Sequence, residues 1–60
     1  MNIGIIGFGK IGKIRAASIR VLRPNASIFY YDTLVEGGVN DVDDIINNPS
    51  IDIVIICTPN

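Results

Sequence analysis

Hydrophobic residues along this 60-residue chain are concentrated in three short runs: Asn2–Ile6, Ser27–Tyr31 and Ile53–Cys57. Each run is nearly continuous and rich in β-branched or aromatic residues, which is typical of strands that are buried in a parallel sheet. The segments between the runs are more polar and long enough to hold a helix or a loop. The pattern therefore predicts three strands with a connection between each consecutive pair.

The first connection is predicted to be a helix that begins near Lys10 or Ile11. Pro24 disfavours helical geometry at the residue before it, so we expect the helix to end near Leu22. The residues that helical spacing places on its apolar side are Ile11, Ile14, Ala17, Ser18, Val21 and Leu22.

The second connection is predicted to hold a shorter helix. Asn40 or Asp41 can cap it through a side-chain oxygen. Asp43 and Asp44 then occupy the first turn, where carboxylates are favoured by the helix dipole. Pro49 limits this helix to about residue 47. The residues expected on its apolar side are Val42, Ile45 and Ile46.

Strands that alternate with helices favour the α/β class with a parallel sheet and right-handed crossovers. Residues 33–38 are expected to form a loop, and Val39 is expected to be the stub of a short extra strand. We predict that the third strand lies beside the first, on the side opposite the second. One face of the sheet should stay partly uncovered, because the short helix cannot shield it alone.

The composition excludes several classes of protein and of site. The hydrophobic fraction of 48% is too high for a disordered chain. A single cysteine, Cys57, rules out an internal disulfide and suits a reducing, cytoplasmic compartment. The absence of histidine excludes imidazole-bound zinc and histidine-activated nucleophiles within these residues. No apolar run approaches the roughly 18 residues of a membrane span, and no basic segment precedes Ile3–Phe8 as in a signal peptide.

The charges are unevenly distributed, although the net charge is only −1. The cations all lie between Lys10 and Arg23, and the carboxylates all lie between Asp32 and Asp52. The cations are spread along a predicted helix and are not interleaved with aromatic residues, so a solvated helix face is favoured over a nucleic-acid interface.

The segment GFGKIG at residues 7–12 matches the pattern G-x-G-x-x-G, between a predicted strand and a predicted helix. In this context Gly7 permits a tight turn, Gly9 permits close approach of a pyrophosphate, and Gly12 permits close packing of the helix on the sheet. The free amides of the first helical turn would hold the phosphates. The intervening residues would contribute mainly main-chain groups: Phe8, Lys10 and Ile11. Direct contact with phosphate is left open for the side chains of Lys10, Lys13 and Arg15.

Asp32 follows the second predicted strand and lies 20 residues beyond Gly12. A carboxylate at this spacing can accept hydrogen bonds from the ribose hydroxyls of a dinucleotide. It would repel a 2′-phosphate, and no arginine follows it, so NAD is expected in preference to NADP. The neighbouring Thr33 is included in the predicted cofactor site. Ligands of open α/β sheets bind beyond the carboxyl ends of the strands, which adds the residues after the third strand: Thr58, Pro59 and Asn60.

Three stretches together resemble the Gfo/Idh/MocA oxidoreductases, which include glucose–fructose oxidoreductase and inositol dehydrogenase. They are IGIIGFGKIGKIRAASIR, the YD after the second strand, and NNPSIDIVIICTPN. The last stretch is similar to a family segment of the form dpdiDaVvIaTPn, and the matching positions are Asp52, Val54, Ile56, Thr58, Pro59 and Asn60. The resemblance covers nearly the whole chain.

The resemblance implies a partial Rossmann fold in which residues 1–60 are the N-terminal part of a dinucleotide-binding domain, without the substrate domain. It implies a nicotinamide cofactor, with Thr58, Pro59 and Asn60 near the nicotinamide half. The implied reaction is hydride transfer at a sugar, nucleotide-sugar or cyclitol hydroxyl. The implied full-length protein is a homo-oligomer with no nucleic-acid or membrane partner.

Two departures from the family pattern leave alternatives open. Residues 33–40 replace the full helix that members carry after the second strand, a shortening that is similar to aspartate dehydrogenases. The Glu-Lys-Pro motif and the later histidine of the family's catalytic part have no counterpart here, so no catalytic residue is assigned. A non-catalytic module that senses NAD is the third hypothesis.

Overall fold

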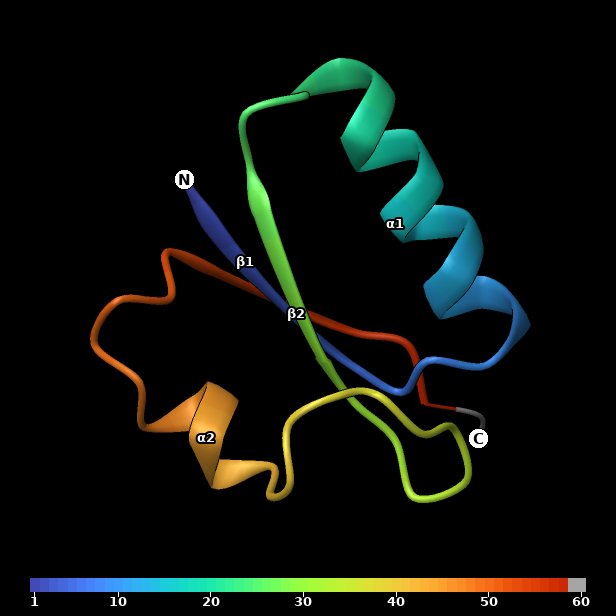
Figure 1. The fold of residues 1–60 in the computed structure, drawn as a ribbon, viewed down its shortest axis with the longest axis vertical. Coiled ribbons are helices and arrows are strands. Elements are labelled where there is room, and N and C mark those ends of the chain that lie inside the picture. The colour runs from blue at the N-terminus through green and yellow to red at the C-terminus, as the bar shows by residue number, and fades with distance from the viewer. Residues whose placement is uncertain (59–60) are drawn as a thin grey trace.

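The computed structural model describes residues 1–58, so the predicted site residues Pro59 and Asn60 lie outside the described residues. The elements are β1 (Asn2–Ile6), α1 (Lys10–Leu22), β2 (Ser27–Tyr31), α2 (Asp43–Ile46) and β3 (Ile53–Ile56), as Figure 1 shows. All five predicted elements are present, and the strand bounds differ from the prediction only at Cys57, which follows β3. No helix within residues 1–58 is long and apolar enough to cross a membrane.

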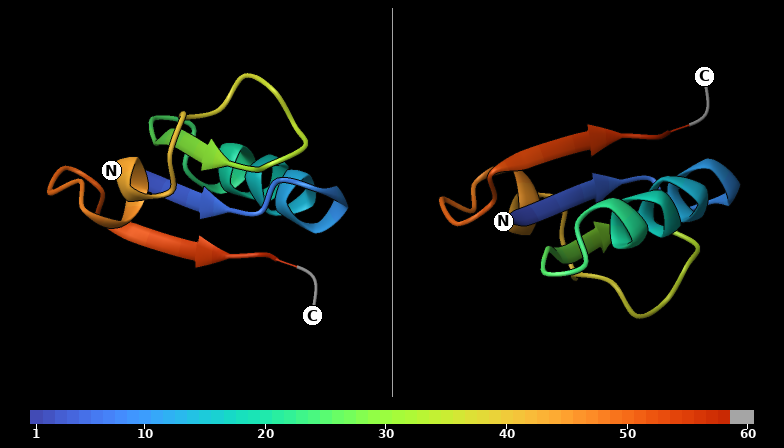
Figure 2. Two further views of the ribbon diagram at one scale, coloured as in Figure 1. Left: turned by 90° about the horizontal axis from the view of Figure 1, so that it is seen from below. Right: turned by 90° about the horizontal axis from the view of Figure 1, so that it is seen from above.

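The strands form one open, all-parallel sheet in the order β2-β1-β3, so the predicted placement of the third strand beside the first is confirmed. Figure 2 shows the three strands side by side and pointing the same way, with β1 in the middle and the two helices on opposite faces. The register pairs Ile5 with Tyr30 on β2 and with Ile55 on β3. This register places these three side chains on the face that α1 covers.

The helix α1 packs on the sheet through a stripe of small side chains and not through the predicted apolar side. Gly12 and Ala16 are its buried residues, and Ile19 packs partly against the core of Ile3, Ile5, Phe8 and Ala16. Four larger residues of the predicted face are exposed: Ile11, Ile14, Val21 and Leu22. The prediction of the buried face was wrong. The small residues Gly12 and Ala16, four positions apart, let the backbone of α1 approach the sheet closely, and this close approach decides which face is buried.

The short helix α2 is attached to the opposite face of the sheet by one side chain, Ile45, which is fully buried. It lies over Gly4, where an added Cβ would come within 2.5 Å of Ile45 Cγ2. The Asp43 amide donates to Asp41 Oδ1 over 2.9 Å, so Asp41 accepts a helix amide as predicted. The N-cap position itself, however, is held by Val42, which forms no side-chain cap. Ile46, predicted to lie on the apolar side, is exposed instead.

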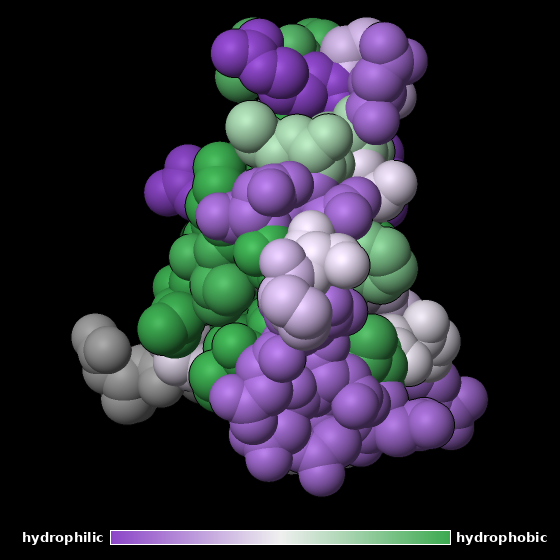
Figure 3. Space-filling view, turned by 90° about the vertical axis from the view of Figure 1, so that its left-hand side faces the viewer, coloured by the Kyte–Doolittle hydropathy of each residue, from purple (hydrophilic) through white to green (hydrophobic). Residues whose placement is uncertain are grey.

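The sheet is partly uncovered on the α2 face, as predicted. Phe29, Val54 and Ile56 point to this face and are exposed, because the single turn of α2 covers only the neighbourhood of Gly4. On one side of the molecule, hydrophobic residues form a patch between hydrophilic regions (Figure 3).

Residues 33–38 form a loop as predicted, but Val39 is not a strand stub. The Val39 amide donates one hydrogen bond to the Tyr30 carbonyl oxygen, over 2.8 Å. A single hydrogen bond is not enough to form a strand, and no strand is assigned at Val39.

Candidate functional site

The chain turns sharply where β1 ends, and Gly7 makes this turn possible. Its φ is +91°, a value that side-chain-bearing residues rarely adopt. A Cβ at Gly7 would also lie 2.9 Å from both the Cys57 carbonyl carbon and the Thr58 amide nitrogen. The predicted role of Gly7 in a tight turn is therefore confirmed, and the turn lies against the residues that follow β3.

The other two glycines of the motif have opposite surroundings. A Cβ at Gly12 would collide with the Gly7 carbonyl oxygen, so α1 needs this glycine to pack against the bend. At Gly9, apart from this residue and its two chain neighbours, no heavy atom of the described residues lies within 4 Å of an added Cβ. The φ of Gly9 is −77°, which other residues also adopt. The fold thus requires glycine at position 12, whereas the space at position 9 is open to a ligand.

The start of α1 presents main-chain donors toward this open space. Gly9 is the N-cap and forms no side-chain cap, so the first amides of the helix are not satisfied by a capping side chain. Such amides, with the positive end of the helix dipole, form a favourable environment for an anion. No acidic residue occupies the first turn of α1, so nothing on the helix itself neutralises this end.

The Asp32 carboxylate joins the glycine bend to the loop after β2. Its Oδ2 accepts a hydrogen bond from the Phe8 amide over 2.6 Å. Its Oδ1 accepts bonds from the amides of Leu34 (2.8 Å) and Val35 (3.3 Å). The side chain is thereby fixed beside the bend, and one lone pair of Oδ2 remains for a further donor.

These hydrogen bonds lower the pKa of Asp32 below its ordinary value of 3.8. The amide of Leu34 has the largest effect and the amide of Phe8 the next, because both stabilise the charged form. Partial desolvation opposes them, and the positive charge of Lys13 adds a small lowering. The carboxylate is therefore ionised at neutral pH and can act only as an acceptor.

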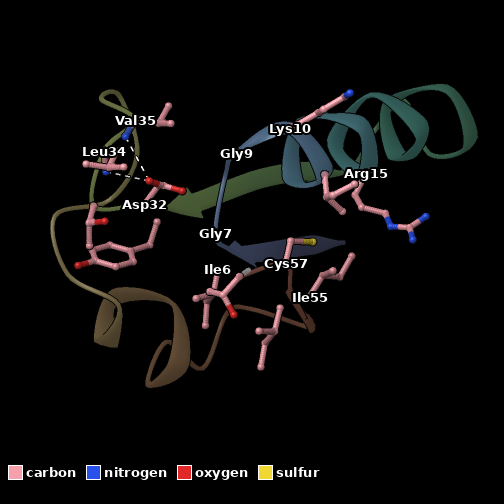
Figure 4. A pocket seen from close by; sticks show the side chains of 15 residues that line it. Ile6, Gly7, Gly9, Lys10, Arg15, Asp32, Leu34, Val35, Ile55 and Cys57 are labelled. Atoms are coloured by element: carbon pink, nitrogen blue, oxygen red, sulfur yellow. Dashed lines mark hydrogen bonds between the residues drawn. The ribbon is translucent and has the colours of Figure 1, made fainter. Parts of the chain in front are cut away.

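The bend, the helix start and Asp32 surround one cleft of about 870 Å³ (Figure 4). Clefts of this size are typical of small-molecule and cofactor sites. Ile55, Ile56 and Cys57 contribute the side that lies along β3. A second hollow of about 570 Å³ lies beside it, along residues 31–40.

The structure gathers most of the predicted site residues at this cleft. Those that line it are Gly7, Gly9, Lys10, Ile11, Asp32, Thr33 and Thr58. Gly12 is buried behind the bend. The Phe8 side chain is also buried and stacks on Tyr30, with ring centroids 3.8 Å apart. Because the Phe8 amide already donates to Asp32, this residue connects the bend to the core and to β2.

Several residues of the cleft were not singled out by the sequence. Leu34 and Val35 fix Asp32 through amides, which no side-chain pattern reveals. Cys57 is partly buried and lines the cleft. Arg15, for which the sequence left direct contact with phosphate open, also lines the cleft.

Within residues 1–58, no cluster of three or more cysteine and carboxylate side chains is arranged to hold a metal ion. No protein-family model, no curated protein and no solved structure matches the chain. The case for a function therefore depends on the sequence and on the geometry of the cleft.

Proposed function

We propose that this chain is the NAD-binding part of an oxidoreductase that transfers hydride between the nicotinamide and a substrate hydroxyl. The main support is one observation: the Asp32 carboxylate is fixed to the Phe8 amide inside a glycine bend whose Gly9 faces open space. Amide donors for a diphosphate and a carboxylate acceptor for ribose hydroxyls are then adjacent at the carboxyl ends of β1 and β2. This is where open α/β sheets bind ligands.

In this proposal, the bend and the first turn of α1 hold the pyrophosphate, and Asp32 accepts a ribose hydroxyl through Oδ2. The hollow along residues 31–40 takes the adenine. A 2′-phosphate at Asp32 would meet an ionised carboxylate, which favours NAD over NADP. Thr58, which lines the cleft after β3, lies on the nicotinamide side.

The cofactor supplies the hydride chemistry, and these residues supply its position and electrostatic environment. We also propose that the chain belongs with the Gfo/Idh/MocA oxidoreductases that it resembles, and that its sheet is part of a Rossmann fold. The proposed substrate is a sugar, a nucleotide sugar or a cyclitol. Residues outside these 60 would carry the acid–base chemistry and bind the substrate.

An aspartate dehydrogenase-like activity is the second candidate. One observation favours it: residues 33–38 form a loop where the first candidate family carries a full helix. Oxidation of a polyol and oxidative deamination of aspartate, assayed with NAD and the full-length protein, distinguish the two activities.

Substitutions at Gly9 and Gly12 test cofactor binding, because Gly9 faces open space and Gly12 is packed against the bend. Gly9→Ala adds a methyl group to the open space, so it should weaken NADH binding about tenfold, or about 1.4 kcal/mol. It should change the unfolding free energy by less than about 1 kcal/mol, the cost of a poorer N-cap residue. NADH fluorescence titration and urea denaturation measure the two quantities.

Gly12→Ala is the matched comparison, because its methyl group meets the Gly7 carbonyl oxygen and not a ligand. We expect it to lower the stability more than Gly9→Ala does. The proposal fails if wild-type protein binds neither NADH nor NADPH, or if Gly9→Ala leaves NADH affinity unchanged.

A further inference from the structure

Arg15 is a cationic side chain of the cleft that the proposed cofactor contacts do not use. Arg15 lies one helical turn beyond Ile11 on the same side of α1, and both residues line the cleft. We propose that Arg15 binds an oxyanion, a carboxylate or a phosphate, on the substrate that meets the nicotinamide. This inference rests on the proposed function and narrows the substrate to a hydroxylated molecule with an anionic group.

The position of Arg15 along the cleft separates it from the ribose site. Figure 4 shows Asp32 on one side of the glycine bend and Arg15 on the other, toward Ile55 and Cys57. Lys10 belongs to the first turn of α1, close to the amides that would hold the pyrophosphate. Arg15 belongs to the next turn, so it lies farther along the helix from the bend than the proposed phosphate site does.

Within residues 1–58, the Asp32 carboxylate that lines the same cleft does not pair with Arg15. Asp32 is the carboxylate that lines it, and its oxygens accept bonds from the amides of Phe8, Leu34 and Val35. The cleft lining along β3 includes the apolar side chains of Ile55 and Ile56, and Arg15 itself is exposed. An arginine can lay its methylene stem on such side chains with its guanidinium in the open part.

A guanidinium in this position favours a particular partner chemistry. Its planar donors match the two oxygens of a carboxylate or phosphate, and the charge-assisted bonds are about twice as strong as neutral ones. A neutral polyol offers no group that uses the charge. A sugar acid, a sugar phosphate or a nucleotide sugar would place an oxyanion here while its hydroxyl faces the nicotinamide.

The other arginines of α1 provide an internal control. Arg20 carries the same charge on the same helix, but it does not line the cleft. Arg23 follows the helix and donates to the Leu22 carbonyl oxygen. If Arg15 acted only through the net charge of α1, removing Arg20 would have the same effect.

The test follows the Nε–H signals of the arginines by NMR in ¹⁵N-labelled protein, assigned with Arg15→Lys and Arg20→Lys. Oxalate, inorganic phosphate and neutral glycerol are titrated separately, each with and without NAD. We expect a saturable shift of the Arg15 signal with oxalate or phosphate, tighter in the presence of NAD, and no shift with glycerol. Arg15→Gln should weaken this binding at least about tenfold, and Arg20→Gln less than about twofold.

Three outcomes would overturn the inference. The first is that the Arg15 signal does not respond to either anion. The second is that the Arg20 signal responds as strongly as the Arg15 signal. The third is that NAD alone shifts the Arg15 signal and that the anions compete with NAD. The last outcome would assign Arg15 to the cofactor phosphates. Failure of the proposed function has a different signature, because NAD then binds nowhere in the cleft and Gly9→Ala has no effect on it.

Discussion

Asp32 combines a structural role with a proposed role in cofactor choice. Its carboxylate accepts three main-chain hydrogen bonds and, in our proposal, discriminates against a 2′-phosphate by its charge. Asp32→Asn keeps the size and removes the charge. We expect the ratio of NADPH to NADH dissociation constants to fall about tenfold, because the repulsion of the phosphate is lost. Fluorescence titration with both cofactors measures the ratio.

Asp43→Asn serves as the control for this experiment, because it makes the same change of net charge on α2, away from the cleft. It should leave the ratio unchanged. An unchanged ratio in Asp32→Asn, with the protein still folded, would show that Asp32 does not face the ribose.

The same carboxylate predicts a dependence of stability on pH. Its pKa is lowered in the folded protein, first by the Leu34 amide and then by the Phe8 amide, so folding favours the ionised form. The resulting stabilisation is fully present above the ordinary value of 3.8 and is lost as the pH falls toward the lower folded value. Urea midpoints between pH 6 and pH 3 should fall more steeply for the wild type than for Asp32→Asn. Parallel curves would contradict this prediction.

At the scale of single elements, α2 depends on one buried side chain. Ile45 is fully buried against the sheet, whereas Ile46 is 57% exposed. Ile45→Ala should therefore lower the unfolding free energy by about 3 kcal/mol, through lost burial and the cavity left over Gly4. Ile46→Ala removes the same atoms from the surface and should cost less than about 0.5 kcal/mol. Urea denaturation compares them, and equal losses would show that α2 does not pack through Ile45.

The elements themselves could be predicted because each is encoded locally. Apolar runs mark β1, β2 and β3, Pro24 limits α1, and Asp41 accepts the Asp43 amide at the start of α2. The buried face of α1 could not be predicted in this way. Helical spacing groups the large residues, such as Ile14 and Val21, but the face that packs is the one where Gly12 and Ala16 let the backbones approach.

The candidate site could be predicted only in part, for a related reason. The glycines and Asp32 have a recognisable spacing, and the structure brings them together at one bend. Arg15 and the amides of Leu34 and Val35 join the site through the course of the chain in three dimensions. No local pattern marks the main-chain amides of Leu34 and Val35, unlike those of the glycine motif.

At the scale of the whole molecule, the covering of the sheet is uneven. The helices lie on opposite faces near β1, while β3 is an edge strand with exposed apolar residues on both faces (Figure 2). Ile53, Val54 and Ile56 are 44%, 42% and 71% exposed. Parallel strands are usually buried on both faces, and exposed apolar edges promote pairing between chains.

This asymmetry predicts that the 60-residue chain associates through β3 as its concentration rises. Ile56→Lys places a charge on that edge and should shift the association to at least about tenfold higher concentration, because edge lysines oppose strand pairing. Val21→Lys is the matched control, since Val21 is also strongly exposed but lies near the end of α1. Light scattering after size-exclusion chromatography, over a hundredfold range of concentration, measures both variants. If Val21→Lys disperses the assemblies as well as Ile56→Lys does, association reflects general surface hydrophobicity and not the free edge of the sheet.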